Sequence, residues 1–221
     1  EPDNRRANLF RGSARFAQQR YAAAEKDFDY VLLQFPRDGN TLLNRGLARL
    51  AMARPDEAIE DFSIVLADDP SLTIALRRRA QAHSLTGAFN LAIEDFDALP
   101  EPNLTDAIWR FIAAKRIARP DAGSVLKSMT EGFDPTIWPG PLVDGLEGQV
   151  TVEVVLREAE RDPSEAASRR TETLFALGQL ALADGQLELA ITSFEAASST
   201  WQPGLIEYQG AVMELERLIK N

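Results

Sequence analysis

Small residues, alanines and phenylalanines recur along this chain with a spacing of 34 residues. Shifting the sequence by 34 positions aligns three segments, 5–38, 39–72 and 73–106. One equivalent position always holds a small residue, in Gly12, Gly46 and Ala80. A second always holds alanine, in Ala24, Ala58 and Ala92, and a third always holds phenylalanine, in Phe28, Phe62 and Phe96. A fourth copy at 171–204 has the same residue types at the equivalent positions Gly178, Ala190 and Phe194. A repeat of this length indicates stacked units that bury a shared core.

Each repeat predicts two antiparallel helices joined by a turn. The small residues let the first helix approach the second, and we expect the phenylalanines to fill the gap between neighbouring units. Pro36 and Pro70 close the first two units, since proline lacks an N–H and restricts the residue before it. This small, alanine, aromatic and proline pattern resembles the tetratricopeptide-repeat (TPR) family. The resemblance implies an all-α solenoid of helix–turn–helix units wound into a right-handed superhelix.

Charged residues follow the same repeat. Arginine occupies one repeat position and aspartate lies 16 residues later, in the pairs Arg11 and Asp27, Arg45 and Asp61, and Arg79 and Asp95. In the last repeat both are replaced, by Leu177 and Ser193. Joint presence and joint loss predict a structural ion pair between the two helices of each of the first three units. A ladder of basic residues for a ligand is the functional alternative.

The regular register breaks after the third unit. We expect one continuous solenoid domain with three parts: TPR units in 1–106, a degenerate repeat and irregular helical segment in 107–170, and a final TPR with its capping helix in 171–221. In the middle part the expected helices cover 105–118, 121–132, a short stretch from Pro135 to about Gly148, and 151–161.

The last part begins with a predicted helix start. Asp162 is expected to cap, and Pro163 to begin, a long helix that ends near Ala183. The final helix, 204–220, is expected to cover the exposed end of the solenoid. Its predicted packing side carries Leu205, Tyr208, Val212, Leu215 and Leu218.

Three segments of the second half carry a closer resemblance. Residues 107–114, 172–178 and 206–215 resemble the new-lipoprotein-I (NlpI) type of bacterial TPR protein. The resemblance implies an outer-membrane lipoprotein facing the periplasm, an adaptor that docks a C-terminal-processing (tail-specific) protease and delivers cell-wall hydrolases to it. It also implies a homodimer. The lipid-attachment cysteine of that family, and the helices that precede its first repeat and help it dimerise, are missing from this sequence.

Composition excludes several classes of partner. The net charge is −10 without a cluster of lysine and arginine on one face, so we expect no nucleic-acid partner. The chain has no cysteine, which excludes disulfides and thiolate metal sites. Its apolar runs are too short to span a bilayer, so membrane attachment is expected only through a lipid anchor outside this sequence. Composition leaves a cytoplasmic location open as well as the periplasmic one.

Candidate catalytic chemistry is sparse. His83 is the single histidine, and we expect it to pack between helices or lie on the surface. The sequence has no nucleophile-and-base pattern, metal-ligand spacing or glycine-rich phosphate loop, so we expect no catalytic residue, no cofactor and no metal. Trp109, Trp138 and Trp201 are expected in the core, with anchoring of a partner as the alternative.

The first helices of the repeats are expected to line a partner-binding groove. The positions predicted to face it are Phe16, Leu43, Leu47, Leu50, Arg77, Gln81, Phe175, Gln179 and Leu182. Such a surface suits an extended or helical segment with apolar anchors. The alternative is that the irregular middle of the chain covers this strip.

Two functions remain open from the sequence. The first is a non-catalytic periplasmic adaptor for a processing protease and its hydrolase substrates. The second is a TPR binding module of another envelope assembly or secretion complex. An enzyme is the third class, and the absence of catalytic motifs argues against it.

Overall fold

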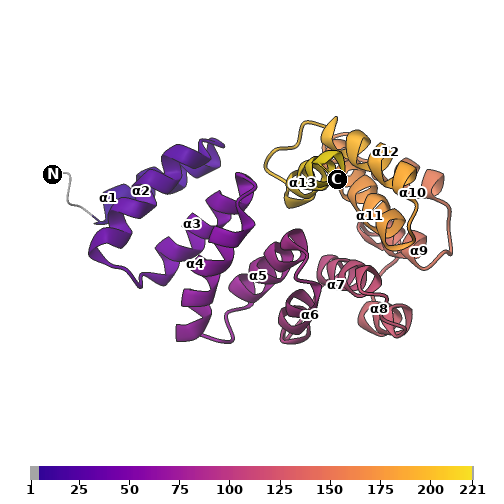
Figure 1. Cartoon of the computed structure of the whole chain (residues 1–221), viewed down its shortest axis with the longest axis horizontal. Helices are drawn as coiled ribbons and strands as arrows, with labels where there is room; N and C mark the ends of the chain where they lie inside the picture. Colours follow the sequence, from indigo (N-terminus) through magenta and orange to yellow (C-terminus); the bar gives the residue numbers. More distant parts are fainter. Residues whose placement is uncertain (1–4, 221) are drawn as a thin grey trace. The chain divides into compact units, whose positions relative to one another are not determined.

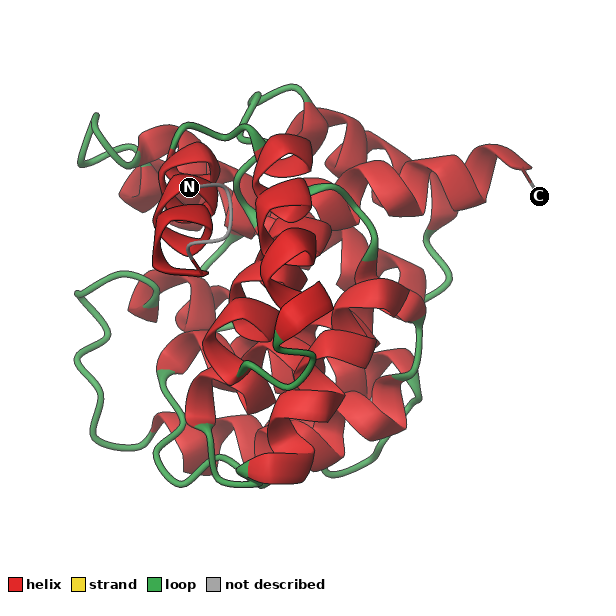
Figure 2. Cartoon of the chain, turned by 90° about the vertical axis from the view of Figure 1, so that its left-hand side faces the viewer, coloured by secondary structure: helices red, strands yellow, loops and turns green. Residues whose placement is uncertain are grey.

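The computed structural model describes residues 5–220 and contains thirteen α-helices and no strand within that range. Figure 2 shows helices joined by loops throughout the described chain. The prediction of an all-α fold is therefore confirmed. The chain divides into two compact units, Glu1–Leu99 and Pro100–Asn221. The single continuous domain stays a prediction, and each unit is described by itself.

Unit 1 consists of three helical hairpins (Figure 1). They are α1 (Arg5–Ala17) with α2 (Tyr21–Gln34), α3 (Gly39–Ala51) with α4 (Pro55–Asp68), and α5 (Thr73–Thr86) with α6 (Phe89–Asp97). Each hairpin falls inside one predicted repeat. Asp38 caps α3 by accepting a hydrogen bond from the Thr41 N–H at 2.9 Å, and Pro55 begins α4.

The turn inside each hairpin has the same backbone conformation. Gln19, Ala53 and Gly87 occupy equivalent repeat positions with φ of 58°, 56° and 83°, and Gly185 does so in the last repeat with φ of 73°. This left-handed conformation costs little for glycine but is strained for the first two residues. The helix pair therefore imposes the turn whichever residue occupies it.

The phenylalanines pack against the small residue of their own repeat, and Phe28 also shares a core cluster with Ala48 of the next repeat, as predicted for that position. A Cβ atom added to Gly46 would lie 2.5 Å from Cε1 of Phe62, and one added to Gly12 would lie 2.6 Å from Cε1 of Phe28. The same contact joins Gly178 and Phe194 in the last repeat. The glycine leaves room on the first helix, and the ring of the second helix fills it.

Unit 1 contains all three expected arginine–aspartate pairs. Nη2 of Arg45 donates to Oδ1 of Asp61 at 2.6 Å. The matching distances are 2.7 Å from Arg11 to Asp27 and 2.6 Å from Arg79 to Asp95. Each aspartate is buried although each belongs to a helix with a solvent-exposed side.

A second cationic position was missed from the sequence. Nη1 of Arg49 donates to Oδ2 of Asp61 at 2.9 Å, and Nη1 of Arg15 donates to Oδ2 of Asp27 at 2.7 Å. Both arginines lie one helical turn after the first arginine, and His83 occupies the equivalent position in the third repeat. The spacing of 34 residues among these three positions could have revealed them.

The arginines also join one repeat to the next. Nη1 of Arg45 donates to Oδ1 of Asp29 at 2.7 Å, and Nη1 of Arg79 donates to Oγ of Ser63 at 3.3 Å. Glu25 accepts from Arg49 at 3.0 Å and from Arg54 at 2.6 Å. Partial burial acts to raise the pKa of Glu25, but these two arginines together lower it below its usual value.

Unit 2 contains a degenerate hairpin, two short helices, and a final hairpin with a capping helix. Their bounds are α7 (Leu104–Arg116), α8 (Ala122–Thr130), α9 (Gly140–Leu146), α10 (Val152–Ala159), α11 (Ala166–Ala183), α12 (Leu187–Ser198) and α13 (Ile206–Lys220).

The predicted start of α11 is wrong. Oδ1 of Asp162 accepts from the Ser164 N–H at 3.0 Å and from its hydroxyl at 2.7 Å. This local turn competes with helix formation, so α11 begins at Ala166.

The capping helix α13 packs against α11 and α12, but not through the predicted apolar side. Its buried side chains include Glu207, Gln209 and Glu214, whereas Tyr208 and Leu215 are only half-buried. The reason is a set of polar partners on α7. Nε1 of Trp109 donates to Oε1 of Glu207 at 3.0 Å, and Nη1 of Arg116 donates to Oε1 of Glu214 at 3.2 Å.

A second indole meets a second carboxylate nearby. Nε1 of Trp138, in the segment before α9, donates to Oε2 of Glu172 on α11 at 2.7 Å. The guanidinium of Arg169 lies 5.6 Å from the centre of the same indole ring. Burial, together with the charge of Glu207, raises the pKa of Glu172 to about 7. The folded unit thus holds a carboxyl group that is partly protonated at neutral pH.

Replacing Asp61 by alanine should lower the free energy of unfolding by about 2–4 kcal/mol, because Arg45 and Arg49 both lose a buried partner. Asp29→Ala is the matched control, since Asp29 pairs with the same Arg45 but its side chain is 47% exposed. That change should cost less than about 1 kcal/mol. Urea denaturation measures both, and equal losses would contradict a structural role for the buried pair.

Glu172→Gln should stabilise the protein above neutral pH by about 2–3 kcal/mol. The folded pKa of about 7 exceeds the usual 4.5, so the contribution of Glu172 to stability is fully present below pH 4.5 and is lost as pH rises through 7. Glutamine keeps an oxygen to accept the Trp138 hydrogen bond. Thermal unfolding across pH 4–9 tests this, with the exposed Glu195→Gln as control. Parallel pH profiles for wild type and Glu172→Gln would show that the proton is not linked to folding.

Candidate functional site

The first helices of unit 1 carry six of the residues predicted to line the groove. Leu43 and Leu47 on α3 are half-buried, as are Phe16 on α1 and Arg77 on α5. Leu50 and Gln81 were expected to face an open groove, but they are only 4% and 2% exposed. Leu50 belongs to α3, which packs against α4 and α5, and Gln81 accepts a hydrogen bond from Arg78 at 3.0 Å.

Phe16 contributes more to the core than to an open surface. Its ring lies 5.3 Å from the ring of Tyr21 in an edge-to-face arrangement, and it packs against Ala24, Phe28 and Ala48. Leu43 and Leu47 therefore remain as the accessible apolar pair of this face, one helical turn apart on α3. We call these two residues the α3 strip.

An exposed aromatic residue on α1 was missed from the sequence. Phe10 is 69% exposed and occupies the repeat position equivalent to Asn44 and Arg78. Its exposure could have been inferred from those two polar equivalents. A large exposed ring on a first helix is a feature that commonly marks contact with another protein.

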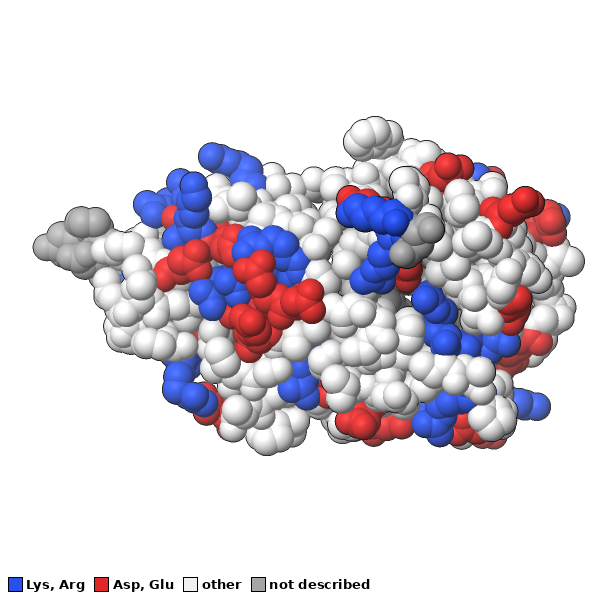
Figure 3. All heavy atoms as spheres, in the orientation of Figure 1, with Lys and Arg blue, Asp and Glu red and all other residues white. Residues whose placement is uncertain are grey.

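The charges of unit 1 are paired rather than segregated. Figure 3 shows acidic and basic side chains interleaved over α2, α3 and α4. The pairs of Arg45 with Asp29, Arg49 with Glu25, and Arg54 with Glu57 belong to this arrangement. Such a surface offers no broad field of one sign, so recognition near the α3 strip depends on apolar contact and local hydrogen bonds.

The three predicted groove residues of unit 2 do not share an open face. Phe175 is 2% exposed, with its ring 5.1 Å from that of Trp109 and 6.2 Å from that of Phe194. Nε2 of Gln179 donates to Oε1 of Glu214 at 3.1 Å, and Gln179 is 4% exposed. Leu182 is half-buried. The expectation of an open surface at Phe175 and Gln179 is wrong, because α7 and α13 cover this side of α11.

The tryptophans differ in their surroundings. Trp109 is in the core and Trp138 is half-buried, bonded as described above. Trp201 is 78% exposed in the loop between α12 and α13, with φ of 53°, so the expectation of core packing is wrong for this residue.

The single histidine, His83, lies on a first helix of unit 1. His83 is half-buried on α5, and burial lowers its pKa. Among residues 5–220, no group of histidine, cysteine, aspartate and glutamate side chains could hold a metal ion. None of the described helices has the length and apolar character needed to cross a membrane.

The repeats match a known family by sequence. The family model for the tetratricopeptide repeat matches residues 1–39 and 43–107 of this chain. No curated protein matches the sequence significantly.

Solved structures are similar over most of the chain. A tetratricopeptide repeat protein from Parabacteroides merdae has 19% sequence identity and a TM-score of 0.61, and the match covers 100% of this chain and 87% of that one. PilW, a widely conserved type IV pilus biogenesis factor, has 16% identity and a TM-score of 0.55, with 94% and 98% covered. The MamA protein has 14% identity and a TM-score of 0.54, with 89% and 91% covered.

At these sequence identities the structural similarity supports the fold alone. It agrees with the hairpins that recur every 34 residues and with the glycine–phenylalanine contact inside each of three repeats. It also agrees with the family match across unit 1. Residues 1–39 and 43–107 thus carry tetratricopeptide repeats, and the chain as a whole has the fold of an all-α, TPR-like solenoid.

Proposed function

We propose that this protein is a non-catalytic scaffold that binds a segment of another protein on the first-helix face of unit 1. TPR domains in general bind proteins. The observation that carries the proposal is the α3 strip, because Leu43 and Leu47 stay half-exposed while the other leucines of α3 are buried. Accessible apolar side chains on a helix whose other leucines are buried suit an apolar anchor of a partner.

The partner we propose is a C-terminal-processing protease, with cell-wall hydrolases as proteins delivered to it. The support is the resemblance of residues 107–114, 172–178 and 206–215 to the NlpI type of TPR adaptor. On this proposal the protein works in the periplasm, attached to the outer membrane by a lipid anchor outside the present sequence. A role in another envelope assembly or secretion complex is the alternative.

Leu47→Asp should weaken partner binding by about 1–3 kcal/mol, which is the scale of one buried aliphatic side chain. A charge placed in the contact would also have to be desolvated. The partner is identified by affinity capture from a bacterial envelope extract and mass spectrometry, and then binding is measured with the purified proteins. Circular dichroism should show the same helix content as the wild type, with a melting temperature within a few degrees.

Leu33→Asp provides the matched control, since Leu33 lies on the second helix α2 and is 80% exposed. This variant should bind the partner as the wild type does. Capture of a processing protease by wild type and Leu33→Asp, with loss by Leu47→Asp, supports the adaptor. Assembly factors in its place support the alternative, and equal capture by all three proteins removes the α3 strip from the binding site.

A further inference from the structure

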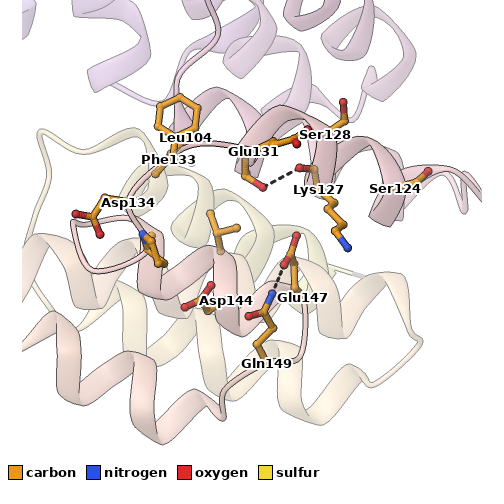
Figure 4. A pocket seen from close by; sticks show the side chains of 14 residues that line it. Leu104, Ser124, Lys127, Ser128, Glu131, Phe133, Asp134, Asp144, Glu147 and Gln149 are labelled. Atoms are coloured by element: carbon orange, nitrogen blue, oxygen red, sulfur yellow. Dashed lines mark hydrogen bonds between the residues drawn. The ribbon is translucent and has the colours of Figure 1, made fainter.

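Unit 2 contains a cavity that does not single out any class of ligand. It has a volume of about 550 Å³ and lies between α7, α8, the segment 131–139 and α9 (Figure 4). Leu104 and Val143 form a buried apolar part of its wall. Two of its polar side chains bond to each other, since Nε2 of Gln149 donates to Oε2 of Glu147. The first helix of unit 1, in contrast, has a surface whose occupant can be inferred from the neighbouring repeats.

In the second and third repeats, the first helix is covered by the second helix of the preceding repeat. α2 packs against α3, and α4 packs against α5. Ala48 of α3 belongs to a core cluster with Ala24 and Phe28 of α2 and is 0% exposed. Ala82 of α5 occupies the equivalent repeat position and is buried to the same extent. Each of these first helices therefore has one side that receives a helix.

The first helix of the first repeat has the same side, but here it is open. α1 lies at the end of unit 1 (Figure 1), where no described hairpin covers it. Ala14, at the position of Ala48 and Ala82, is exposed. Phe10 is 69% exposed, and Ala7 is exposed as well. The spacing of residues 7, 10 and 14 places them on one side of the helix, which we call the α1 face.

Two carboxylates of α2 complete its contact with α3. Oδ1 of Asp29 accepts from Nη1 of Arg45 at 2.7 Å, and Oε1 of Glu25 accepts from Nε of Arg49 at 3.0 Å. Glu25 and Asp29 are about one helical turn apart, so they lie along one side of α2. The covering helix thus supplies one negative charge to each arginine of the helix that it covers.

α1 presents the same two arginines without these carboxylates. Arg11 and Arg15 occupy the positions of Arg45 and Arg49, and both bond to Asp27 of their own repeat. Among the described residues, Nη1 of Arg11 and Nε of Arg15 have no acceptor. The two side chains are 56% and 30% exposed. Each guanidinium therefore keeps a donor for a carboxylate from outside the chain.

Charge complementarity favours a helix of another protein over a second copy of this chain. Among the second helices of the four repeats, only α2 has acidic residues at the positions of Glu25 and Asp29, and α3 already binds both of them. The equivalent pairs are Ile59 and Ser63 on α4, Ile93 and Asp97 on α6, and Ile191 and Glu195 on α12.

We propose that the α1 face binds an amphipathic helix of a partner protein, with two carboxylates one turn apart beside its apolar side. The apolar side packs on Ala7, Phe10 and Ala14, and the carboxylates accept hydrogen bonds from Arg11 and Arg15. The partner helix takes the place on α1 that α2 has on α3. The α1 face and the α3 strip share no residue, and the inference does not depend on the partner proposed for that strip.

The probe is a peptide with the sequence of residues 20–35, acetylated and amidated, because α2 already has the required pair of carboxylates. It is titrated into the ¹⁵N-labelled full chain and followed by two-dimensional NMR. Saturable shifts are expected for the backbone amides of residues 7–15. A control peptide with Glu25→Gln and Asp29→Asn should bind at least about tenfold more weakly, the scale of one charge-assisted hydrogen bond.

Ala14→Glu should lose at least about tenfold in affinity for the probe, because its larger and negative side chain would meet the incoming helix. Ala22→Glu is the matched control, since this position of α2 is exposed and its equivalents Asp56 and Asn90 are exposed too. It should bind the probe as the wild type does. Circular dichroism should show unchanged helix content in both variants. Should Ala14→Glu lose helix content, Phe10→Glu replaces it.

Four results would overturn the proposal. The first three are shifts confined to residues outside α1, equal binding of the control peptide, and unchanged affinity in a folded Ala14→Glu variant. The fourth concerns a second copy as the occupant. Analytical ultracentrifugation should show that the wild type without peptide does not associate through the α1 face, and a dimer that Ala14→Glu dissociates would assign the face to a second copy.

Discussion

The first unit depends on a buried carboxylate placed between two cationic side chains. On α4 this group is Asp61, and the cations are Arg45 and Arg49, one turn apart on α3. A buried carboxylate is tolerated only when it is paired and hydrogen bonded. The two helices therefore align in the register that brings the three side chains together. That register also seats Phe62 on Gly46. The ion pairs thus specify the alignment, while the apolar contacts supply most of the stabilisation.

The last repeat uses a different source of polar contacts. Leu177, Ala181 and Ser193 replace the two cations and the aspartate, and the Ser193 hydroxyl donates to the backbone oxygen of Leu189 at 2.7 Å. The inner side of α11 is instead bonded to α7 and α13, through Gln179, Arg116 and Glu214. The arginine–aspartate pairs are therefore a property of stacked regular hairpins, and their loss accompanies a hairpin closed by a capping helix.

The repeats, the helix pairs and the arginine–aspartate pairs could be predicted because each leaves a mark at a fixed spacing. The inward side of α13 could not, because the apolar side chains of this helix form a regular stripe while its partners lie far away in sequence. Trp109 and Arg116 each bond to a residue 98 positions later. The burial of Phe175 was missed for the same reason, since a single-repeat pattern does not include the helices that cover it. The cavity beside α9 lies in a segment without any repeat, so no spacing could reveal it.

The carboxyl group of Glu172 has a consequence for any event that loosens Trp138. Its pKa of about 7 arises from burial, and exposure to water would return the pKa toward its usual 4.5. At neutral pH the opened form would then release part of a proton to the solution. A ligand that displaces Trp138 would therefore bind with a heat that includes the ionisation of the buffer, so calorimetry in two buffers would count the proton. The proton is released only if the movement also exposes Glu172 to water, because the hydrogen bond from Trp138 by itself lowers the pKa of this carboxyl group.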